Sequence, residues 1–361
     1  MPRPSHFSID LNALVHNFEA LSRLAGSRQK MAVVKADAYG HGAVACAQVL
    51  EGSVDAFAVA ITEEAIELRD AGIAKPILVL QGPHSTEDLT AMTAHSLWPA
   101  VSNHHQLTWL MAQRDKPDQV WLKVDTGMHR LGFDPSDLAD ARSALHTAGI
   151  GNTTLMSHLA DAEDAESALT HRQATRWNDV LKDQNDGAES YEQASFSNSA
   201  STVGALSPPE SWVRLGYSLY GGSLIDLPAE LQLRPVMTFT SKVAATRWIE
   251  PGETVGYGGR WVAHRRSRIA TIPVGYGDGY PRAAADGTPI GTPYGKVPLA
   301  GKVSMDMITA DVTDIPDIDF GTEVTLWGST PSADEVAAHC DTIGYELCTR
   351  ITGRTPRRFS R

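Results

Sequence analysis

The chain has 361 residues, a length that exceeds one small domain and suits a large barrel joined to a second unit. It carries 31 Lys and Arg against 43 Asp and Glu, a net charge of −12, so we do not expect a nucleic-acid-binding protein, which needs clustered cations. Its three cysteines have neither disulfide-framework nor zinc-site spacing, and no apolar run approaches the roughly 18 residues of a membrane span, so we expect a soluble, cytoplasmic protein without a metal centre.

Between residues 31 and 216, short apolar runs alternate with helix-like segments. The runs are 31–35, 55–60, 76–81, 96–101, 119–124, 153–158, 193–198 and 212–216. The segment 62–72 is typical of the helices, because Thr62 suits an N-cap, acidic residues fill the first turn and Gly72 suits the end. Strands that alternate with helices indicate a parallel sheet, and eight of them at near-regular spacing favour a closed (β/α)8 barrel of the TIM type over an open sheet.

After Leu233 the pattern changes to alternating polar and apolar runs that Gly and Pro separate. This pattern predicts a mainly antiparallel, β-rich domain with one late helix in 332–340, capped by Ser332. We therefore predict two domains, 1–232 and 233–361, and expect residues 1–9 to pack on the second.

In a barrel of this kind, the residues that follow the strands share one rim, and that rim carries the chemistry. Cations, aromatic rings and small polar residues follow five of the predicted strands. They are Lys35, Tyr39, Lys123, Arg130, His158, Asn198, Ser199, Arg214, Gly216 and Tyr217. These residue types suit a phosphorylated aldehyde cofactor, since a lysine can link to it, Ser199 and nearby amides can hold phosphate, and an arginine can meet a ring nitrogen.

Each of these residues also has an ordinary structural explanation. A lone lysine after a strand is usually a solvated surface group, and a lone histidine such as His158 is usually a hydrogen-bonded structural residue. Arg130 could form an ion pair with Asp125, and KVDTGMHRLGF could be a turn that needs Gly127 for its backbone. The set as a whole, rather than any one member, points to a site.

Two glycine-flanked tyrosines stand out in the second domain. Tyr257 lies in ETVGYGGRW and Tyr276 in IPVGYGDGYPR, where glycines would present each ring at a loop tip. Met305 and Asp306 lie in GKVSMDM. On local evidence, hairpin turns with tyrosines at the sheet edge explain the two tyrosine motifs about as well. A plain strand likewise explains GKVSMDM.

Taken together, the motifs resemble those of bacterial alanine racemases. The motifs are VVKADAYGHG, KVDTGMHRLGF, SNSAS, RLGYSLYGG, TVGYGGRW, VGYGDGYPR and GKVSMDM, which keep the family's order over nearly the whole chain. The resemblance implies a pyridoxal 5'-phosphate barrel joined to a β domain. It also implies a head-to-tail homodimer in which each active site takes its β-domain residues from the other subunit.

The resemblance further implies roles, carried over by position. Lys35 resembles the lysine that links to the cofactor, and with Tyr257 of the other subunit it would form a pair of catalytic bases. The implied cofactor site is Lys35, Tyr39, His158, Asn198, Ser199, Arg214, Gly216 and Tyr217. Arg130, Met305, Tyr276 and Asp306 would meet the substrate, and Lys123 resembles a lysine that is carbamylated in many members.

Three positions depart from the family pattern. Asp37 stands where many members have Asn, Ser304 where Cys often precedes Met-Asp, and Gly353 where some members place a tyrosine near the phosphate. None of the three removes a catalytic group, but Gly353 leaves one phosphate contact unaccounted for.

The implied reaction interconverts L-alanine and D-alanine and supplies D-alanine for peptidoglycan. Racemisation removes a proton from one face of Cα and returns it to the other, so one base on each face is the direct arrangement. The sequence leaves open a racemase of broader specificity, a decarboxylase on the same two-domain plan and a non-catalytic cofactor-binding barrel. The β domain with Tyr257 argues against the last of these.

Overall fold

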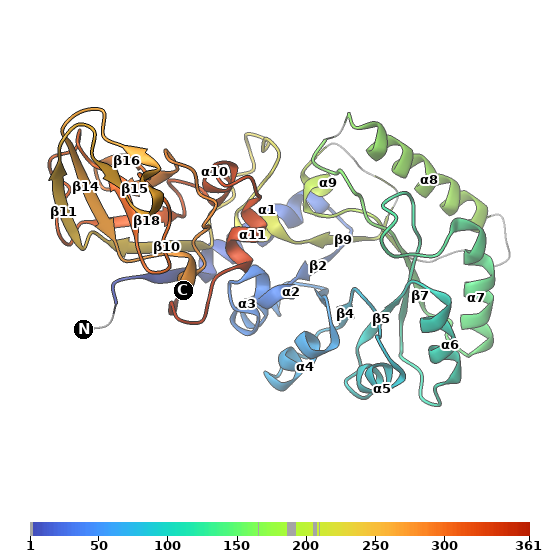
Figure 1. The fold of residues 1–361 in the computed structure, drawn as a ribbon. Helices are drawn as coiled ribbons and strands as arrows, with labels where there is room; N and C mark the ends of the chain where they lie inside the picture. Colours follow the sequence, from blue (N-terminus) through green and yellow to red (C-terminus); the bar gives the residue numbers. More distant parts are fainter. Residues whose placement is uncertain (1–2, 165, 186–192, 205–207, 209) are drawn as a thin grey trace.

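The computed structural model describes residues 3–164, 166–185, 193–204, 208 and 210–361. Figure 1 shows a ring of strands with helices around it beside a β-rich part, with α10 (Ala333–Ala338) and α11 (Gly344–Thr349) between the two. In the described part of the chain, no helix is both long enough and apolar enough to cross a bilayer.

Eight parallel strands close into a barrel, in which β9 pairs with β2. The strands are β2 (Gln29–Val33), β3 (Ala56–Val59), β4 (Ile77–Val79), β5 (Trp98–Val101), β6 (Val120–Lys123), β7 (Thr153–Met156), β8 (Gln193–Ser195) and β9 (Trp212–Leu215). Each strand overlaps one predicted run, so the predicted (β/α)8 barrel is confirmed. The helices of this part are α1 (Leu11–Ala25), α2 (Lys35–Tyr39), α3 (Ala43–Leu50), α4 (Thr62–Asp70), α5 (Thr86–Ala94), α6 (His104–Ala112), α7 (Leu138–Thr147), α8 (Ala168–Asn185) and α9 (Ser199–Val203).

Side-chain caps fix where the barrel helices begin. Ser85 Oγ accepts the N–H of Asp88 (3.1 Å) at the start of α5. At α4 the predicted cap is wrong, because Thr62 is the first helical residue and its hydroxyl has no partner among the described residues. The carboxylate of Glu64 takes the capping role instead and accepts the N–H of Ala60 (2.7 Å).

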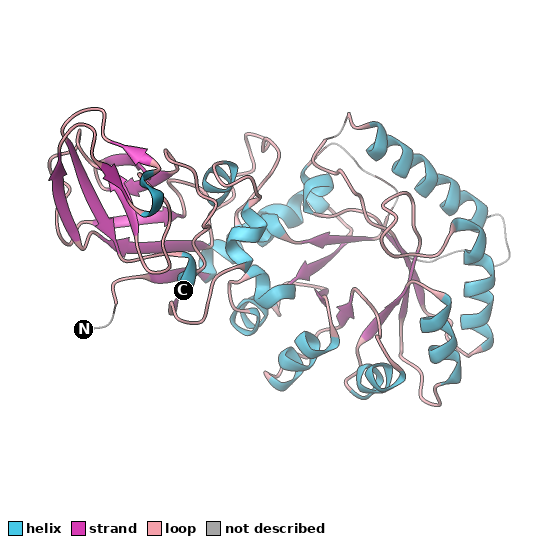
Figure 2. Cartoon of the chain, in the orientation of Figure 1, coloured by secondary structure: helices cyan, strands magenta, loops and turns pink. Residues whose placement is uncertain are grey.

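The β-rich part is mainly antiparallel, as predicted, and its strands gather in one block in Figure 2. One sheet has the order β16-β15-β18-β10-β1-β19, a second has the order β11-β14-β17, and β12 pairs with β13. The strands are β1 (His6–Asp10), β10 (Met237–Lys242), β11 (Ala245–Ile249), β12 (Thr254–Val255), β13 (Trp261–Val262), β14 (Ser267–Ile272), β15 (Pro289–Thr292), β16 (Gly295–Pro298), β17 (Ile308–Asp311), β18 (Glu323–Trp327) and β19 (Arg357–Ser360). β1 lies between β10 and β19, antiparallel to the first and parallel to the second. The predicted cap Ser332 is confirmed, since its Oγ accepts the N–H of Glu335 (3.0 Å) at the start of α10.

Aromatic rings fill the interior of the barrel. Trp121 of β6 and Trp212 of β9 meet edge to face with centroids 5.6 Å apart, although their strands are not neighbours. Trp98 packs on both, with centroid distances of 6.3 and 6.0 Å. A packed interior holds the strands in fixed positions, so the residues at their carboxyl ends project from a rigid base.

Candidate active site

One cavity of about 1250 Å³ lies at the carboxyl ends of the barrel strands. All ten rim residues predicted from the sequence line it. They are Lys35, Tyr39, Lys123, Arg130, His158, Asn198, Ser199, Arg214, Gly216 and Tyr217. The structure therefore brings together side chains that are widely separated along the chain, while their roles stay predictions.

Lys35 follows the first barrel strand and begins an unusual turn. The residues 36–39 all have left-handed backbone angles, with φ between +51° and +55°. This conformation costs roughly 1–2 kcal/mol for each non-glycine residue, so four in a row must be held by surrounding contacts. One such contact is the hydrogen bond from the Ala36 N–H to Glu64 Oε1 (2.6 Å), made by the same carboxylate that caps α4.

Cations dominate the cavity wall. The side chains of Lys35, Lys123 and Arg130 form no ion pair or hydrogen bond with the residues that the structure describes. Burial and the Arg130 guanidinium lower the pKa of Lys35 below its usual range. Burial, followed by Arg214 and Arg130, lowers the pKa of Lys123 to about 8. A concave site with this charge suits an anionic ligand, such as a phosphate or a carboxylate.

Arg214 is buried on β9, and its contacts determine the protonation state of His158. Its Nη1 donates to Ser195 Oγ (2.5 Å), and its Nη2 donates to the carbonyl oxygens of Ser157 (2.7 Å) and Phe196 (3.2 Å). Nη2 also lies 3.3 Å from His158 Nδ1, which must accept because a guanidinium only donates. Burial and Arg214 hold the pKa of His158 well below its usual range, so this ring is neutral.

The Nε–H donor of Arg214 is not used within the described part of the chain. Its Nε has no hydrogen-bond partner among the described residues, although the side chain is buried and lines the cavity. Burial lowers the pKa of Arg214 to about 10, so the group remains a cation at neutral pH. A charged donor that lines a cavity and has no partner in the described chain can bind an acceptor on a ligand.

Tyr39, Ser199 and Gly216 form a polar part of the wall. The Gly216 N–H donates to Ser199 Oγ (2.7 Å), and the Tyr39 hydroxyl has no hydrogen-bond partner among the described residues. A Cβ at position 216 would lie 2.8 Å from Tyr39 Oη, so glycine keeps this space open. Burial raises the pKa of Tyr39, which therefore keeps its proton and can donate it to an anion. Asn198 caps α9 by accepting the N–H of Ser201 (3.0 Å).

The Asp125 carboxylate serves a turn rather than Arg130. Its Oδ1 accepts the N–H groups of Gly127 (2.8 Å) and His129 (3.1 Å), and its Oδ2 lies 3.0 Å from His129 Nδ1. The explanation of Arg130 as an ion pair with Asp125 is therefore wrong. The turn explanation holds, because Gly127 has φ of +132°, and the turn leaves Arg130 on the cavity wall.

Sequence reasoning missed the part of the wall that α11 and its flank supply. The missed residues are Ile343, Tyr345, Glu346 and Thr349. The Tyr345 ring stacks on Tyr217 with centroids 3.9 Å apart and lies 6.0 Å from the Tyr39 ring. Gly353 does not line the cavity, and Tyr345 supplies an aromatic ring beside the two predicted tyrosines instead. A tyrosine at the start of a short helix gave no signal, because its position depends on contact between the two parts of the chain.

The four predicted residues of the β-rich part lie outside this cavity. Tyr257 begins η3 (Tyr257–Gly259) and is 73% exposed, and Tyr276 begins η4 (Tyr276–Asp278) and is 36% exposed. Met305 is 51% exposed, and Asp306 is exposed beside it. Within one chain, therefore, the structure does not bring Tyr257 to Lys35.

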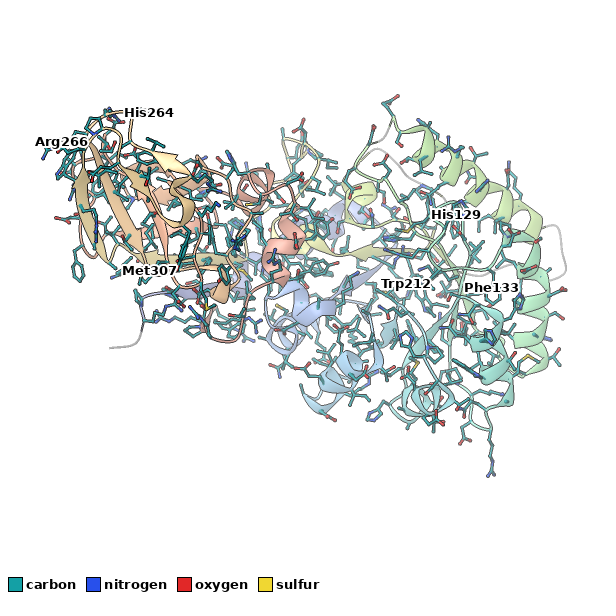
Figure 3. All side chains as sticks on the ribbon, in the orientation of Figure 1. His129, Phe133, Trp212, His264, Arg266 and Met307 are labelled. Atoms are coloured by element: carbon teal, nitrogen blue, oxygen red, sulfur yellow. The ribbon has the colours of Figure 1, made fainter. Side chains whose placement is uncertain are left out.

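Three of these four residues do lie together. The N–H groups of Tyr276 and Gly277 donate to the carbonyl oxygens of Ser304 (3.1 Å) and Met305 (2.9 Å). The Ser304 hydroxyl closes this turn, since it donates to the Met307 carbonyl (2.7 Å) and accepts the Met307 N–H (3.1 Å). Figure 3 labels Met307 on the β-rich part, well away from the labelled barrel residues.

A buried carboxylate anchors these turns. Asp278 accepts hydrogen bonds from Arg3 (2.5 and 2.6 Å), from Arg354 (2.8 Å) and from the Thr355 hydroxyl (2.9 Å). Arg354 also pairs with Asp306 (2.7 Å). Burial raises the pKa of Asp278, but the two guanidiniums outweigh it and lower that pKa to about 2.

Comparison with known proteins gives consistent matches along the chain. The family model described as "Alanine racemase, N-terminal domain" matches residues 9–224, and "Alanine racemase, C-terminal domain" matches residues 236–359. Curated alanine racemases of Xylella fastidiosa and Chromohalobacter salexigens are each 44% identical to the chain. The first match covers 96% of this chain and 94% of the relative, and the second covers 99% and 98%. The biosynthetic alanine racemase structure from Pseudomonas aeruginosa superposes with a TM-score of 0.94 at 39% identity and full coverage of both chains.

Proposed function

Since this chain belongs to the alanine racemase family and is an isomerase, we propose that it interconverts L-alanine and D-alanine with pyridoxal 5'-phosphate bound in the barrel cavity. The observation that carries the proposal is a half-buried lysine with a lowered pKa among three further cations, two of them without partners in the described chain. The phosphate of the cofactor and the carboxylate of an amino acid are anions that such a cavity can bind.

The donors that line the cavity fit this cofactor. Tyr39 and Ser199 would bind the phosphate in the space that Gly216 leaves open. The unpartnered Nε of Arg214 would meet the ring nitrogen, and a permanent cation there keeps that nitrogen without a proton. The full cofactor site would comprise Lys35, Tyr39, His158, Asn198, Ser199, Arg214, Gly216 and Tyr217.

Two residues of the protein would move the proton. When bound, pyridoxal phosphate supplies an electron sink that makes the Cα–H of alanine acidic. Lys35 would serve one face of Cα and Tyr257 of the partner subunit the other, so that one accepts a proton while the other donates one. The lowered pKa of Lys35 increases its neutral fraction, which is the form that accepts a proton. Following the family pattern, we assign the proton of the D-isomer to Lys35 and that of the L-isomer to Tyr257.

The second base is proposed to come from another copy of the chain. Tyr257 is exposed and outside the cavity of its own chain, as are Tyr276, Met305 and Asp306. A homodimer in which the β-rich part of one subunit covers the cavity of the other would place all four near the substrate. Arg130 would then meet the substrate from the barrel side.

Lys123 is proposed to carry a carbamate. A pKa of about 8 leaves part of this amine neutral near neutral pH, and a neutral amine can add carbon dioxide as it releases one N–H proton to water. The product is an anion, which suits the unpartnered guanidinium of Arg130 on the same cavity wall. Intact mass measured under native conditions, with and without bicarbonate, should differ by one carbon dioxide, and Lys123→Ala should abolish the difference.

A chiral product assay tests the proposed function. Purified protein with added pyridoxal phosphate is given L-alanine, L-serine, L-lysine and L-arginine separately. We expect fast formation of D-alanine and little D-isomer from the other three, which would suit a supplier of D-alanine for peptidoglycan. D-isomers of the larger amino acids at comparable rates would indicate a broader racemase, and carbon dioxide from lysine or arginine would indicate a decarboxylase. Bound cofactor with no product at all would contradict the proposal.

A further inference from the structure

We propose that the ion pair between Asp37 and Arg357 makes the C-terminal strand a positioning element for Lys35. This inference rests on the proposed function, in which Lys35 links to the cofactor. Asp37 and Arg357 are positioning residues here, because neither lines the cavity in which the chemistry would occur. The pair lies between the turn that carries Lys35 and a strand that ends the chain more than 300 residues later.

The turn needs external support, because its backbone is left-handed at four consecutive non-glycine residues, 36–39. At its start, Glu64 accepts the Ala36 N–H (2.6 Å) and supplies support from the barrel. Within the turn, Asp37 Oδ1 accepts the Ala43 N–H (2.7 Å), which ties the turn to the first residue of α3. Two carboxylates therefore hold the turn to its surroundings.

The second oxygen of Asp37 reaches the β-rich part. Asp37 Oδ2 lies 2.7 Å from Arg357 Nη2, the guanidinium of the first residue of β19. β19 is itself fixed, because it pairs with β1, with Arg357 opposite Phe7. The charged side chain thus connects the turn to a strand held in a six-stranded sheet.

Close packing accompanies the ion pair. A Cβ added at Gly42 would lie 2.8 Å from the Phe359 ring, and one added at Gly40 would overlap the Cys348 carbonyl oxygen. The C-terminal segment therefore contacts the turn through backbone and ring atoms as well as through Arg357. This arrangement gives a reason for Asp rather than Asn at position 37, since an amide could accept the Ala43 N–H but would carry no charge for Arg357.

The first test follows amide hydrogen exchange in the full-length protein without cofactor. The variants are Asp37→Ala, Asp37→Asn, Arg357→Gln and the double variant Asp37→Asn with Arg357→Gln. Lys296→Gln is the matched control, since it breaks a similarly exposed ion pair, with Glu335 (2.6 Å), elsewhere in the β-rich part. We expect exchange in 36–43 to be about threefold faster in each single variant and unchanged in the control.

The double variant supplies a coupling test. Because Asp37→Asn and Arg357→Gln remove the same interaction, the double variant should exchange no faster than either single variant. Exchange in 36–43 that matches wild type in both single variants would overturn the inference, and so would effects that simply add in the double variant. Neither result depends on cofactor binding, so this test stands even if the proposed function fails.

The second test measures the Kd for pyridoxal phosphate by fluorescence titration of the cofactor-free protein. We expect about threefold weaker binding in Asp37→Asn and Arg357→Gln and unchanged binding in Lys296→Gln. Wild-type protein that binds no pyridoxal phosphate would contradict the proposed function and leave the exchange result to decide the inference. Wild-type binding with unchanged Kd in both variants would overturn the inference and leave the proposed function standing.

Discussion

The amine of Lys35 lies in a cationic environment that favours its neutral form. Burial and Arg130 lower its pKa, and the Glu64 carboxylate opposes this effect without cancelling it. A neutral amine is the form that attacks an aldehyde, so the neighbours of Lys35 prepare it for the proposed cofactor before any ligand arrives.

Arg130→Met should therefore slow cofactor uptake at mildly alkaline pH. Removing this cation raises the pKa of Lys35, so a smaller fraction of the amine is neutral at any pH below that value. We expect the midpoint of the uptake rate against pH to move upward. Stopped-flow absorbance after mixing cofactor-free protein with pyridoxal phosphate gives the midpoint. Arg114→Met, at an exposed arginine that does not line the cavity, should leave it unchanged. An unchanged midpoint in Arg130→Met would contradict this account.

At the scale of residues, position in or just after a strand was sufficient to predict the ten barrel residues of the cavity wall, with Lys123 and Arg214 inside β6 and β9. The residues that were missed act through tertiary contacts. Glu64 looks like an ordinary acidic residue in the first turn of a helix, yet it also accepts the Ala36 N–H. No local sequence pattern predicts a contact of this kind. The roles of all these residues stay predictions until tested.

Asp334 of α10 supports the aromatic wall of the cavity through two hydrogen bonds. The Tyr217 hydroxyl donates to Asp334 Oδ1 (2.7 Å), and the Ser223 N–H reaches Asp334 Oδ2 (3.2 Å). The Tyr217 ring in turn stacks on Tyr345 of α11. The aromatic wall therefore depends on a carboxylate at the start of α10.

Asp334→Ala should loosen this wall and destabilise the protein. It leaves the buried Tyr217 hydroxyl without its acceptor, which costs about 1–3 kcal/mol. In a domain of this size that loss lowers the melting temperature by roughly 2–8 °C. Glu335→Gln on the same helix breaks only an exposed pair and should change it little. Equal melting temperatures for Asp334→Ala and wild type would contradict the assignment.

A second prediction at the scale of elements concerns Asp278 and the way in which the stability of the protein depends on pH. Its pKa of about 2 lies below the ordinary value, so its contribution to stability is complete above about pH 4 and is lost as pH falls towards 2. Asp278→Asn should lower the free energy of unfolding at pH 7 by about 2 kcal/mol. Urea unfolding between pH 7 and pH 3 should also show a weaker loss of stability with acid in the variant. The same acid dependence in both proteins would rule out this role.

Helices and strands were predicted well where the spacing of apolar residues determines them. They were predicted poorly where tertiary contacts determine them. All eight barrel strands have apolar runs that stand out in the sequence. The left-handed turn 36–39 could not be predicted, because Ala, Asp and Tyr ordinarily avoid this conformation and only the contacts around the turn enforce it. The cap of α4 was missed for a related reason, since Glu64 replaced the expected Thr62. The domain boundary at residues 232 and 233 stays a prediction.

On the scale of the whole molecule, the residues of the proposed site are divided between two parts of the chain, the barrel and the β-rich part. The cavity holds Lys35, while the exposed Tyr257 lies on the β-rich part. A site completed by a second copy explains why so many apolar side chains of the β-rich part are exposed. They include Val262, Tyr276, Met305 and Met307.

Mixing two inactive variants should restore activity. Lys35→Ala and Tyr257→Phe each inactivate both sites of their own homodimer, but a hybrid dimer contains one site with both native residues. Random exchange of equal amounts should return about a quarter of wild-type activity, because half of the dimers are hybrids with one intact site. Exchange is verified with differently tagged subunits. No recovery among proven hybrids would show that each site is built within one chain.

The position of β1 in the last sheet has a consequence for synthesis on the ribosome. β1 is made first, yet its neighbours β10 and β19 are made much later, and β19 ends at Ser360. The barrel can form while the chain is still growing, but β1 has no partner strand until β10 emerges, and its other edge stays open until β19 emerges. Since Arg357 also lies on β19, a nascent chain would keep its Lys35 turn loosely held until β19 leaves the exit tunnel. We therefore expect nascent chains stalled before residue 357 to bind pyridoxal phosphate weakly.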